Sequence, residues 1–313
     1  MESRFSDNCI FSSSLLYLIV RNFHQKGQAL VLVLLSLAVV LTLVLFILSR
    51  SITDIATSSR DEEAIRAFSA AEAGIEKALV IGVGSSTTQI GDATFSADVS
   101  GFAEGLSAFT YPINLASNDS ATLWFASHDT DNNLVCDVTH PCFSGNTLKV
   151  CWGKGGTSSS SGTTPAVEVS IFYATSPLDF STVRIARAAF DPNTGRSNNF
   201  SDPDNGGCTI GSESFAFQKT VTLSSLGIPA GSYGVDGGLL FAKLRMFYNS
   251  DESHTAGFDV NFAGNDTLPS QGLLVNSTGS SGEANRRLEV FQAWAEVPPI
   301  FDSVVFSGGS LVK

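Results

Sequence analysis

The chain has 313 residues, a formal net charge of −12 at pH 7 and only 15% charged residues, against about 25% in typical soluble proteins. An acidic surface repels phosphate backbones, so this charge disfavours binding to nucleic acids. Ser, Thr, Asn and Gly supply the polarity instead, as in many secreted surface proteins, whose acidic groups maintain solubility.

Residues 1–27 are interpreted as a leader that is removed from the mature protein. The apolar run in this leader, from Ile10 to Val20, has about 11 residues and is too short to span a bilayer. It is either a signal-like segment or a sign that translation starts downstream of Met1. The leader ends in the polar, basic sequence His24-Gln25-Lys26-Gly27.

An uncharged apolar run follows at residues 29–48, interrupted only by one Ser and one Thr. About 20 such residues are enough to cross a bilayer as a helix. Arg50 follows the run, while Arg21 and Lys26 precede it. The positive-inside rule therefore places the leader side in the cytoplasm and the rest of the chain outside.

The helix is expected to continue beyond the membrane and to span residues 28–79. Neither Gly nor Pro occurs between Gln28 and Ala73, and glycines at positions 82 and 84 provide a stop. In the second half, apolar residues at helical spacing form a stripe that we expect to pack on a sheet. These residues are Ile65, Phe68, Ile75 and Leu79.

Two motifs make this layout resemble a type IV pilin. Gly27 followed by Gln28 at the edge of the apolar run is similar to a prepilin peptidase site, and Ala67-Phe68-Ser69-Ala70-Ala71-Glu72-Ala73 resembles the helix of PilX-type minor pilins. The C-terminal sequence PPIFDSVVFSGGSL is similar to pilin-like proteins of uncultivated bacteria. The resemblance implies cleavage after Gly27 and a methylated amine on Gln28. The implied partners are other pilin subunits through the N-terminal helix, the prepilin peptidase and the membrane.

One position departs from the pattern of most major pilins. They carry Glu at the fifth mature position, where this chain has Leu32. A carboxylate in hydrocarbon is costly unless it is paired, and PilX-like proteins and the K-type pseudopilin of type II secretion also tend to lack it. The departure favours a rare or tip-located subunit over the bulk subunit of a fibre.

Beyond residue 80 the apolar periodicity changes to two, which predicts strands. The run at 239–248 is apolar on both faces apart from Lys243 and Arg245, as in a central strand. The other expected strands are 94–99, 121–128, 148–152, 166–175, 183–186, 215–223, 258–262 and 288–290.

Two loops between these strands are long and polar. The loop at 153–164 is rich in Ser and Gly and is expected to be exposed and mobile, and a second long loop is expected at 191–207. We therefore predict an α+β fold. A long N-terminal helix, with a membrane half and an amphipathic half, packs on a mostly antiparallel, β-rich extracytoplasmic head of residues 80–313.

Five cysteines are present, and Cys9 lies in the leader. Cys136, Cys142, Cys151 and Cys208 remain, an even number that predicts up to two disulfides in an exported protein. We expect Cys142 or Cys151 to pair with Cys208. Free thiols and zinc are the alternatives, and zinc is disfavoured because no C-x-x-C motif or Cys/His cluster at ligand spacing occurs.

Asp129, Asp131 and Asn133 alternate as in the first half of a calcium loop. Leu134 stands where the Gly of such a loop is expected, and the twelfth position is His140 rather than an acidic residue. The favoured interpretation is a turn rich in Asp and Asn, with calcium as the alternative. No other metal and no cofactor are expected.

No catalytic motif is found: H-E-x-x-H, G-x-S-x-G and the P-loop are all absent, so we expect no enzymatic activity. Trp124, Trp152 and Trp294 either line a sugar-binding surface or pack in the core, which aromatic residues of strands favour. Glu72 is expected to be a solvated helix position rather than a functional carboxylate.

Together these observations predict a minor pilin or pilin-like subunit that takes part in type IV pilus assembly or adhesion after prepilin peptidase processing. It crosses the inner or cytoplasmic membrane once, with its head outside, and is a candidate for incorporation into a surface pilus. The alternatives are a membrane-anchored surface binding protein, that is an adhesin, and a pseudopilin of type II secretion.

Overall fold

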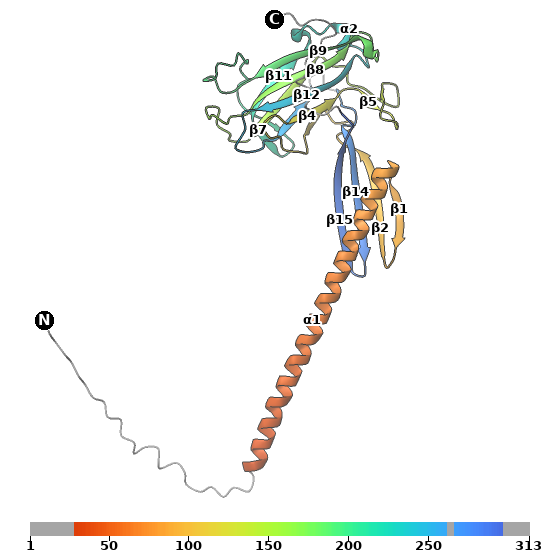
Figure 1. Ribbon diagram of the computed structural model, residues 1–313, viewed down its shortest axis with the longest axis vertical. Coiled ribbons are helices and arrows are strands. Elements are labelled where there is room, and N and C mark those ends of the chain that lie inside the picture. The colour runs from red at the N-terminus through yellow and green to blue at the C-terminus, as the bar shows by residue number, and fades with distance from the viewer. Residues whose placement is uncertain (1–27, 262–265, 297–313) are drawn as a thin grey trace, which may run out of the picture. The chain divides into compact units, whose positions relative to one another are not determined.

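The structure is a computed structural model that describes residues 28–261 and 266–296 (Figure 1). The chain divides into two compact units, residues 1–62 and 63–313, and each is considered by itself. The predicted leader with Gly27 lies outside the described residues, as does the C-terminal sequence PPIFDSVVFSGGSL. The predicted division of the chain into leader, helix and head stays a prediction.

The long helix α1 comprises 54 residues, Gln28–Ile81. It ends beside the predicted glycine: Gly82 has a φ of +76° and its amide donates to the carbonyl of Ala78 at 2.8 Å. Glycine adopts this left-handed conformation without the steric cost of a Cβ, which is why it terminates helices. The helix therefore ends at Ile81 rather than at residue 79.

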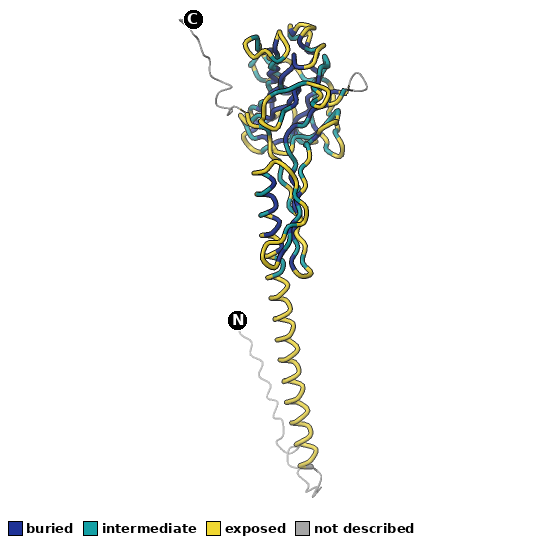
Figure 2. Tube along the Cα trace, turned by 90° about the vertical axis from the view of Figure 1, so that its right-hand side faces the viewer, coloured by how far each residue is buried: buried dark blue, intermediate teal, exposed yellow. Residues whose placement is uncertain are grey.

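A four-stranded antiparallel sheet packs on the part of α1 that belongs to the second unit (Figure 1). Its strands are β1 (Ser85–Ile90), β2 (Ala93–Gly101), β14 (Gly272–Ser281) and β15 (Ala284–Ala293), in the order β1-β2-β14-β15. We call residues 63–101 and 272–293 the helix–sheet module. Figure 2 shows the buried residues along one side of α1 in this module.

The predicted apolar stripe makes only part of this contact. Ile75 is buried and Leu79 half-buried against Val275 and its neighbours, whereas Ile65 and Phe68 are 67% and 43% exposed. The prediction was therefore wrong for Ile65 and Phe68, which are not buried against the sheet.

Small residues make most of the helix face that contacts the sheet. These are Ala67, Ala70, Ala71, Gly74 and Ala78, all buried. The helix and β14 approach so closely that a Cβ at Gly279 would collide with the backbone carbonyl of Ala67. At this separation a large side chain cannot fit between the helix and the sheet.

Residues 102–271 form two larger antiparallel sheets, which we call the sandwich. The five-stranded sheet has the order β10-β11-β7-β13-β3, the four-stranded sheet has the order β4-β12-β8-β9, and β5 pairs with β6. The strands are β3 (Ala108–Thr110), β4 (Ser120–Trp124), β5 (Ser127–His128), β6 (Leu134–Val135), β7 (Thr147–Lys154), β8 (Ala166–Ala174), β9 (Val183–Phe190), β10 (Cys208–Ile210), β11 (Glu213–Thr222), β12 (Leu239–Phe247) and β13 (Ala256–Asp259). Short helical turns lie at Phe180–Thr182, Leu223–Leu226 and α2 (Ala230–Tyr233).

The two larger sheets share one hydrophobic core. Alternate residues of β7 and β8 enter it, among them Leu148, Trp152, Val167 and Ile171, all fully buried. Burying a side chain of this size contributes about 1.5–3 kcal/mol. The predicted α+β fold class is confirmed, and β12 lies between β4 and β8 as the predicted central strand. The sequence did not predict β1, β3, β6, β10 or β14.

The sandwich is inserted between β2 and β14 of the helix–sheet module. At the junction, the amide of Phe102 donates to the carbonyl of Gly272, and the amide of Gln271 donates to the carbonyl of Phe102, both at 2.8 Å. The buried Gln271 side chain also accepts from the amide of Trp124 at 2.7 Å and donates to its carbonyl at 2.9 Å. The chain thus enters and leaves the sandwich at neighbouring positions.

Candidate functional site

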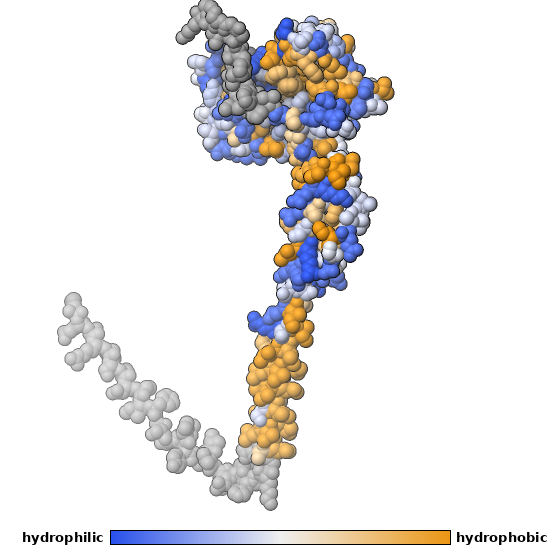
Figure 3. Space-filling model, turned by 45° about the vertical axis from the view of Figure 1, so that its right-hand side comes forward, coloured by the Kyte–Doolittle hydropathy of each residue, from blue (hydrophilic) through white to orange (hydrophobic). Residues whose placement is uncertain are grey.

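The first unit presents an apolar helical surface. Its large apolar residues from 30 to 48 are all exposed, for example Leu30 at 67% and Phe46 at 65%. Figure 3 shows this part of the helix mostly in orange, the colour of hydrophobic residues. The two hydroxyls in this run are satisfied within the helix, since Ser36 donates to the carbonyl of Val33 and Thr42 to that of Val39, at 2.9 and 2.8 Å. The described chain contains one helix apolar and long enough to cross a membrane, and none of its apolar window is buried.

Such a surface has few stable environments. In water, each exposed apolar side chain of this size forgoes roughly 1.5–3 kcal/mol of burial. Lipid or other apolar helices accept such a surface, because a helix satisfies the backbone groups of its interior by its own hydrogen bonds. The same helix continues into the second unit, where its small-residue face packs on an antiparallel sheet. This architecture is pilin-like.

Comparisons with protein-family models, with curated proteins and with solved structures find no match. The pilin-like description therefore rests on the arrangement of the helix and the sheets.

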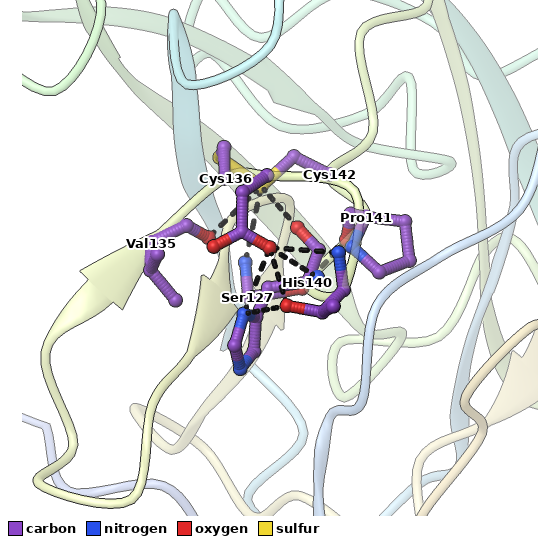
Figure 4. Close-up of a disulfide and its surroundings, with 8 residues drawn as sticks. Ser127, Val135, Cys136, His140, Pro141 and Cys142 are labelled. Carbon is purple, nitrogen blue, oxygen red and sulfur yellow. Dashed lines mark hydrogen bonds and ion pairs between the residues drawn. A yellow bond between two sulfur atoms is a disulfide. The ribbon is translucent and has the colours of Figure 1, made fainter.

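Two disulfides tie the sandwich, Cys136–Cys142 and Cys151–Cys208. The second confirms one of the two expected pairings, because Cys151 bonds Cys208, and the alternative of Cys142 with Cys208 was wrong. Cys142 instead closes a short loop with Cys136 (Figure 4). All four sulfurs are used in these bonds.

Hydrogen bonds order the short disulfide loop, residues 136–142. A carboxylate oxygen of Asp137 accepts from the Thr139 hydroxyl and amide, both at 2.7 Å, and from the His140 amide at 2.9 Å. These bonds, the Thr139 hydroxyl first and the His140 side chain next, hold the pKa of Asp137 well below its usual range. The Ser127 hydroxyl donates to the carbonyl of Pro141 at 2.6 Å (Figure 4).

Among the calcium candidates, Asp129 caps its own turn. Its Oδ1 accepts from the amides of Asp131 and Asn133 at 2.9 and 2.8 Å, and the Asn133 amide group donates to Oδ2 at 3.1 Å. These bonds lower the pKa of Asp129, and the backbone amide of Asn133 makes the largest contribution. The geometry is that of the Asx turn, while calcium binding stays an untested alternative.

The side chain of Arg196 links the two long loops: it lies in the loop at 191–207 and bonds the backbone of the loop at 153–164. Its Nη1 pairs with Asp191 at 2.9 Å, and its Nη2 donates to the carbonyls of Gly162 and Thr164 at 2.9 Å. The guanidinium also lies 4.1 Å from the centroid of the Tyr248 ring. Both members of the ion pair are largely buried, so the loops form one ordered surface.

Sequence reasoning missed Arg196 and Asp191 as organising residues. The available signal was the lone arginine of a loop otherwise rich in Asp, Asn, Ser and Gly. Trp124 and Trp152 are buried in the sandwich, as expected for core residues, while Trp294 is half-buried. The expected sugar-binding surface stays a prediction. Glu72 is exposed on α1, as expected.

Proposed function

We propose that the protein is a minor pilin or pilin-like subunit that takes part in type IV pilus assembly or adhesion after prepilin peptidase processing. Its partners in this role are other pilin subunits, the prepilin peptidase and the membrane. The role is assembly rather than catalysis, and it requires no cofactor.

The observation that carries the proposal is the exposed apolar surface of residues 29–48 at the start of a helix that continues onto a sheet. Before assembly, the bilayer covers this surface. During assembly, the helices of neighbouring subunits replace the lipid, which is feasible because the new surroundings are equally apolar and the backbone groups of the helix interior are bonded within the helix.

The side chain at position 32 supports a minor rather than a bulk role. Leu32 is 61% exposed on the apolar helix and cannot form the ion pair that a glutamate at this position would offer to a neighbouring amine. A subunit without that pair depends on apolar packing alone for its register, which suits a rare or tip-located position.

The location of the head follows from the same features. The one apolar helix of the described residues and the two disulfides support a membrane-anchored chain whose sandwich lies in an oxidising, extracytoplasmic compartment. The exposed surface formed by the loops at 153–164 and 191–207 supports adhesion as a second role, because ordered loops on a rigid scaffold commonly carry binding.

N-terminal sequencing tests the proposal directly. The protein is purified from a host with an active prepilin peptidase and from the same host lacking it. We expect a mature chain beginning at Gln28, with a methylated amine, only in the first host. A Gly27→Val variant should keep its leader, while the matched control Ser36→Ala should be processed normally.

Retention of the leader by the wild-type chain in the first host would refute the proposal and leave a plain membrane-anchored surface protein. Proteomics of sheared filaments then tests the minor role, since recovery of this chain as the dominant component would contradict it. Recovery with secretion-system components but not with pili would favour a pseudopilin.

A further inference from the structure

A cleft of about 190 Å³ lies where the disulfide loop meets β2 and β14. Thr139, His140 and Pro141 of the disulfide loop line it together with Glu104, Leu273 and Trp294. Ser127, His128 and Ser270 also contribute, so the lining mixes aromatic, hydroxyl and carboxylate groups. This mixture of an apolar surface with a few convergent polar groups is typical of small-molecule sites.

Stacked rings form one wall of the cleft. The Trp294 indole stacks on the His128 imidazole, with ring centroids 4.6 Å apart and planes 15° apart, and His128 meets Trp124 edge-on at 4.4 Å. The Trp294 Nε1 donates to the carbonyl of Ser270 at 2.9 Å, which fixes the indole. The wall is therefore oriented before any ligand arrives.

The aromatic wall is uncharged at neutral pH. Burial lowers the pKa of His128 to about 4 and outweighs the opposing attraction of Asp129. The His128 Nδ1 is buried and has no hydrogen-bond partner among the described residues. The neutral His128 imidazole therefore forms an uncharged stack with Trp294, and this wall neither attracts nor repels ions.

The oxygens of the cleft are arranged as acceptors. The Ser127 hydroxyl donates to the carbonyl of Pro141 and the Ser270 hydroxyl to that of Gly272, both at 2.6 Å, so their protons are already used. Glu104 is exposed and its carboxylate lies over Gly101, where a Cβ would collide with it. A ligand that binds these oxygens must therefore supply hydrogen-bond donors.

We propose that this cleft binds one neutral sugar ring, with its C–H face against Trp294 and its hydroxyls donating to Glu104 and the serine oxygens. A pyranose combines an apolar face with an edge of donors, as this lining requires. The cleft is smaller than the roughly 300–1,000 Å³ of sites for drug-sized ligands, which favours a single ring. Glu104 and the net charge of −12 disfavour an anionic ligand.

The sugar site is independent of the proposed assembly role, because it uses only residues of the second unit. The alternative for an acceptor-rich aromatic cleft is a small ammonium ion, which also binds next to aromatic rings and carboxylates. The test therefore includes an ammonium probe beside the sugars.

Saturation-transfer NMR on the full-length protein tests this proposal. The protein is kept in a polyoxyethylene detergent, which carries neither sugar nor ammonium groups. The probes are methyl β-glucoside, methyl β-galactoside, methyl α-mannoside, N-acetylglucosamine and tetramethylammonium. We expect transfer to at least one of the sugars and none to tetramethylammonium.

Three variants locate the binding. Trp294→Ala should abolish the transfer, and Glu104→Gln should weaken the affinity about tenfold, because a hydrogen bond to a charged acceptor is replaced by one to a neutral acceptor. Val138→Ala, in the same disulfide loop but fully exposed and outside the cleft lining, should bind like the wild type.

Absence of transfer to every sugar would overturn the proposal, as would transfer to tetramethylammonium alone. Binding that is undiminished in Glu104→Gln would also overturn it. Glu104 is exposed, so this variant should fold and should decide the question even if Trp294→Ala does not fold.

Discussion

Replacing Gly74 with Ala should destabilise the helix–sheet module, although the same change stabilises an ordinary helix. Gly74 lies within α1 and faces β2 and β14. A Cβ at this position would collide with the Ser277 hydroxyl and would lie 2.9 Å from Cδ2 of Phe95, closer than carbon atoms approach one another in folded proteins.

Two opposing terms decide the magnitude. Ala is favoured over Gly in a helix by about 1 kcal/mol, while inserting a methyl group into a packed interface costs about 1–3 kcal/mol. Because the added Cβ would lie within 3.0 Å of both the Ser277 hydroxyl and the Phe95 ring, we expect the packing cost to fall in the upper half of that range. The free energy of unfolding should then decrease by about 1–2 kcal/mol. The Ser277→Ala background should reduce the loss, since it removes the oxygen that Cβ would strike.

Amide hydrogen exchange on the full chain in detergent measures this effect through the opening free energies of the amides in β14 and in residues 63–81. Gly231→Ala is the matched control, because Gly231 also lies in a helix but its added Cβ would meet no atom of another segment within 4 Å. It should be neutral or stabilising. Equal protection of Gly74→Ala and Gly231→Ala would refute the close-packing argument.

Three further predictions follow from the sandwich. Arg196→Ala should remove the guanidinium that donates to the carbonyls of Gly162 and Thr164 in loop 153–164. Limited proteolysis should then cut that loop at least tenfold faster than in the wild type, and an unchanged cleavage rate would show that the loop is ordered without Arg196. Removing the Cys151–Cys208 disulfide should lower the free energy of unfolding by about 4 kcal/mol and removing Cys136–Cys142 by about 2 kcal/mol, because the former closes the longer loop. In denaturant unfolding, the Cys-to-Ser pair at 151 and 208 should therefore have the lower midpoint of the two double variants. Because the pKa of His128 is lowered to about 4 in the folded protein, the unfolded state binds a proton at this residue before the folded state does as the pH falls from about 6.5 towards 4. The Tm should therefore fall in this pH window, and His128→Phe should reduce the fall. Parallel curves of Tm against pH for the two proteins would contradict a neutral His128.

The long helix and the sandwich strands could be predicted from the sequence because their signals are local. The apolar run of 29–48 and the glycine at position 82 determine the course of α1, and the alternation in 148–152 and 166–175 identifies two core strands. In each case the burial of a residue follows from its own neighbours in the sequence.

The helix–sheet contact could not be predicted in the same way. Strand β14 was missed because its buried face carries Ser277, Gly279 and Ser281 beside Val275, so its apolar alternation is weak. These small residues match the alanines and Gly74 of α1, and that match exists only once the two segments, far apart in the chain, are side by side. Ile65 and Phe68 were misplaced for the same reason.

The loops and the disulfides show a similar limit. A stretch such as 153–164, rich in Ser and Gly, has no apolar side chains to order it. It is held instead by hydrogen bonds from other loops, among them those of Arg196 and Asn193. Four cysteines allow three pairings, and only the tertiary fold brings Cys151 of β7 to Cys208 of β10. The cleft beside Trp294 likewise combines residues from positions 101 to 294.

The insertion of residues 102–271 between two paired strands has a mechanical consequence. Two covalent connections lead from the helix–sheet module into the sandwich, and Gly101 and Leu273 are register partners where these connections leave. Any pull on the sandwich is therefore shared between adjacent strands, and a single break in one connection does not detach it. A sandwich connected in this way therefore stays attached after a single chain break that would release a domain held by one linker.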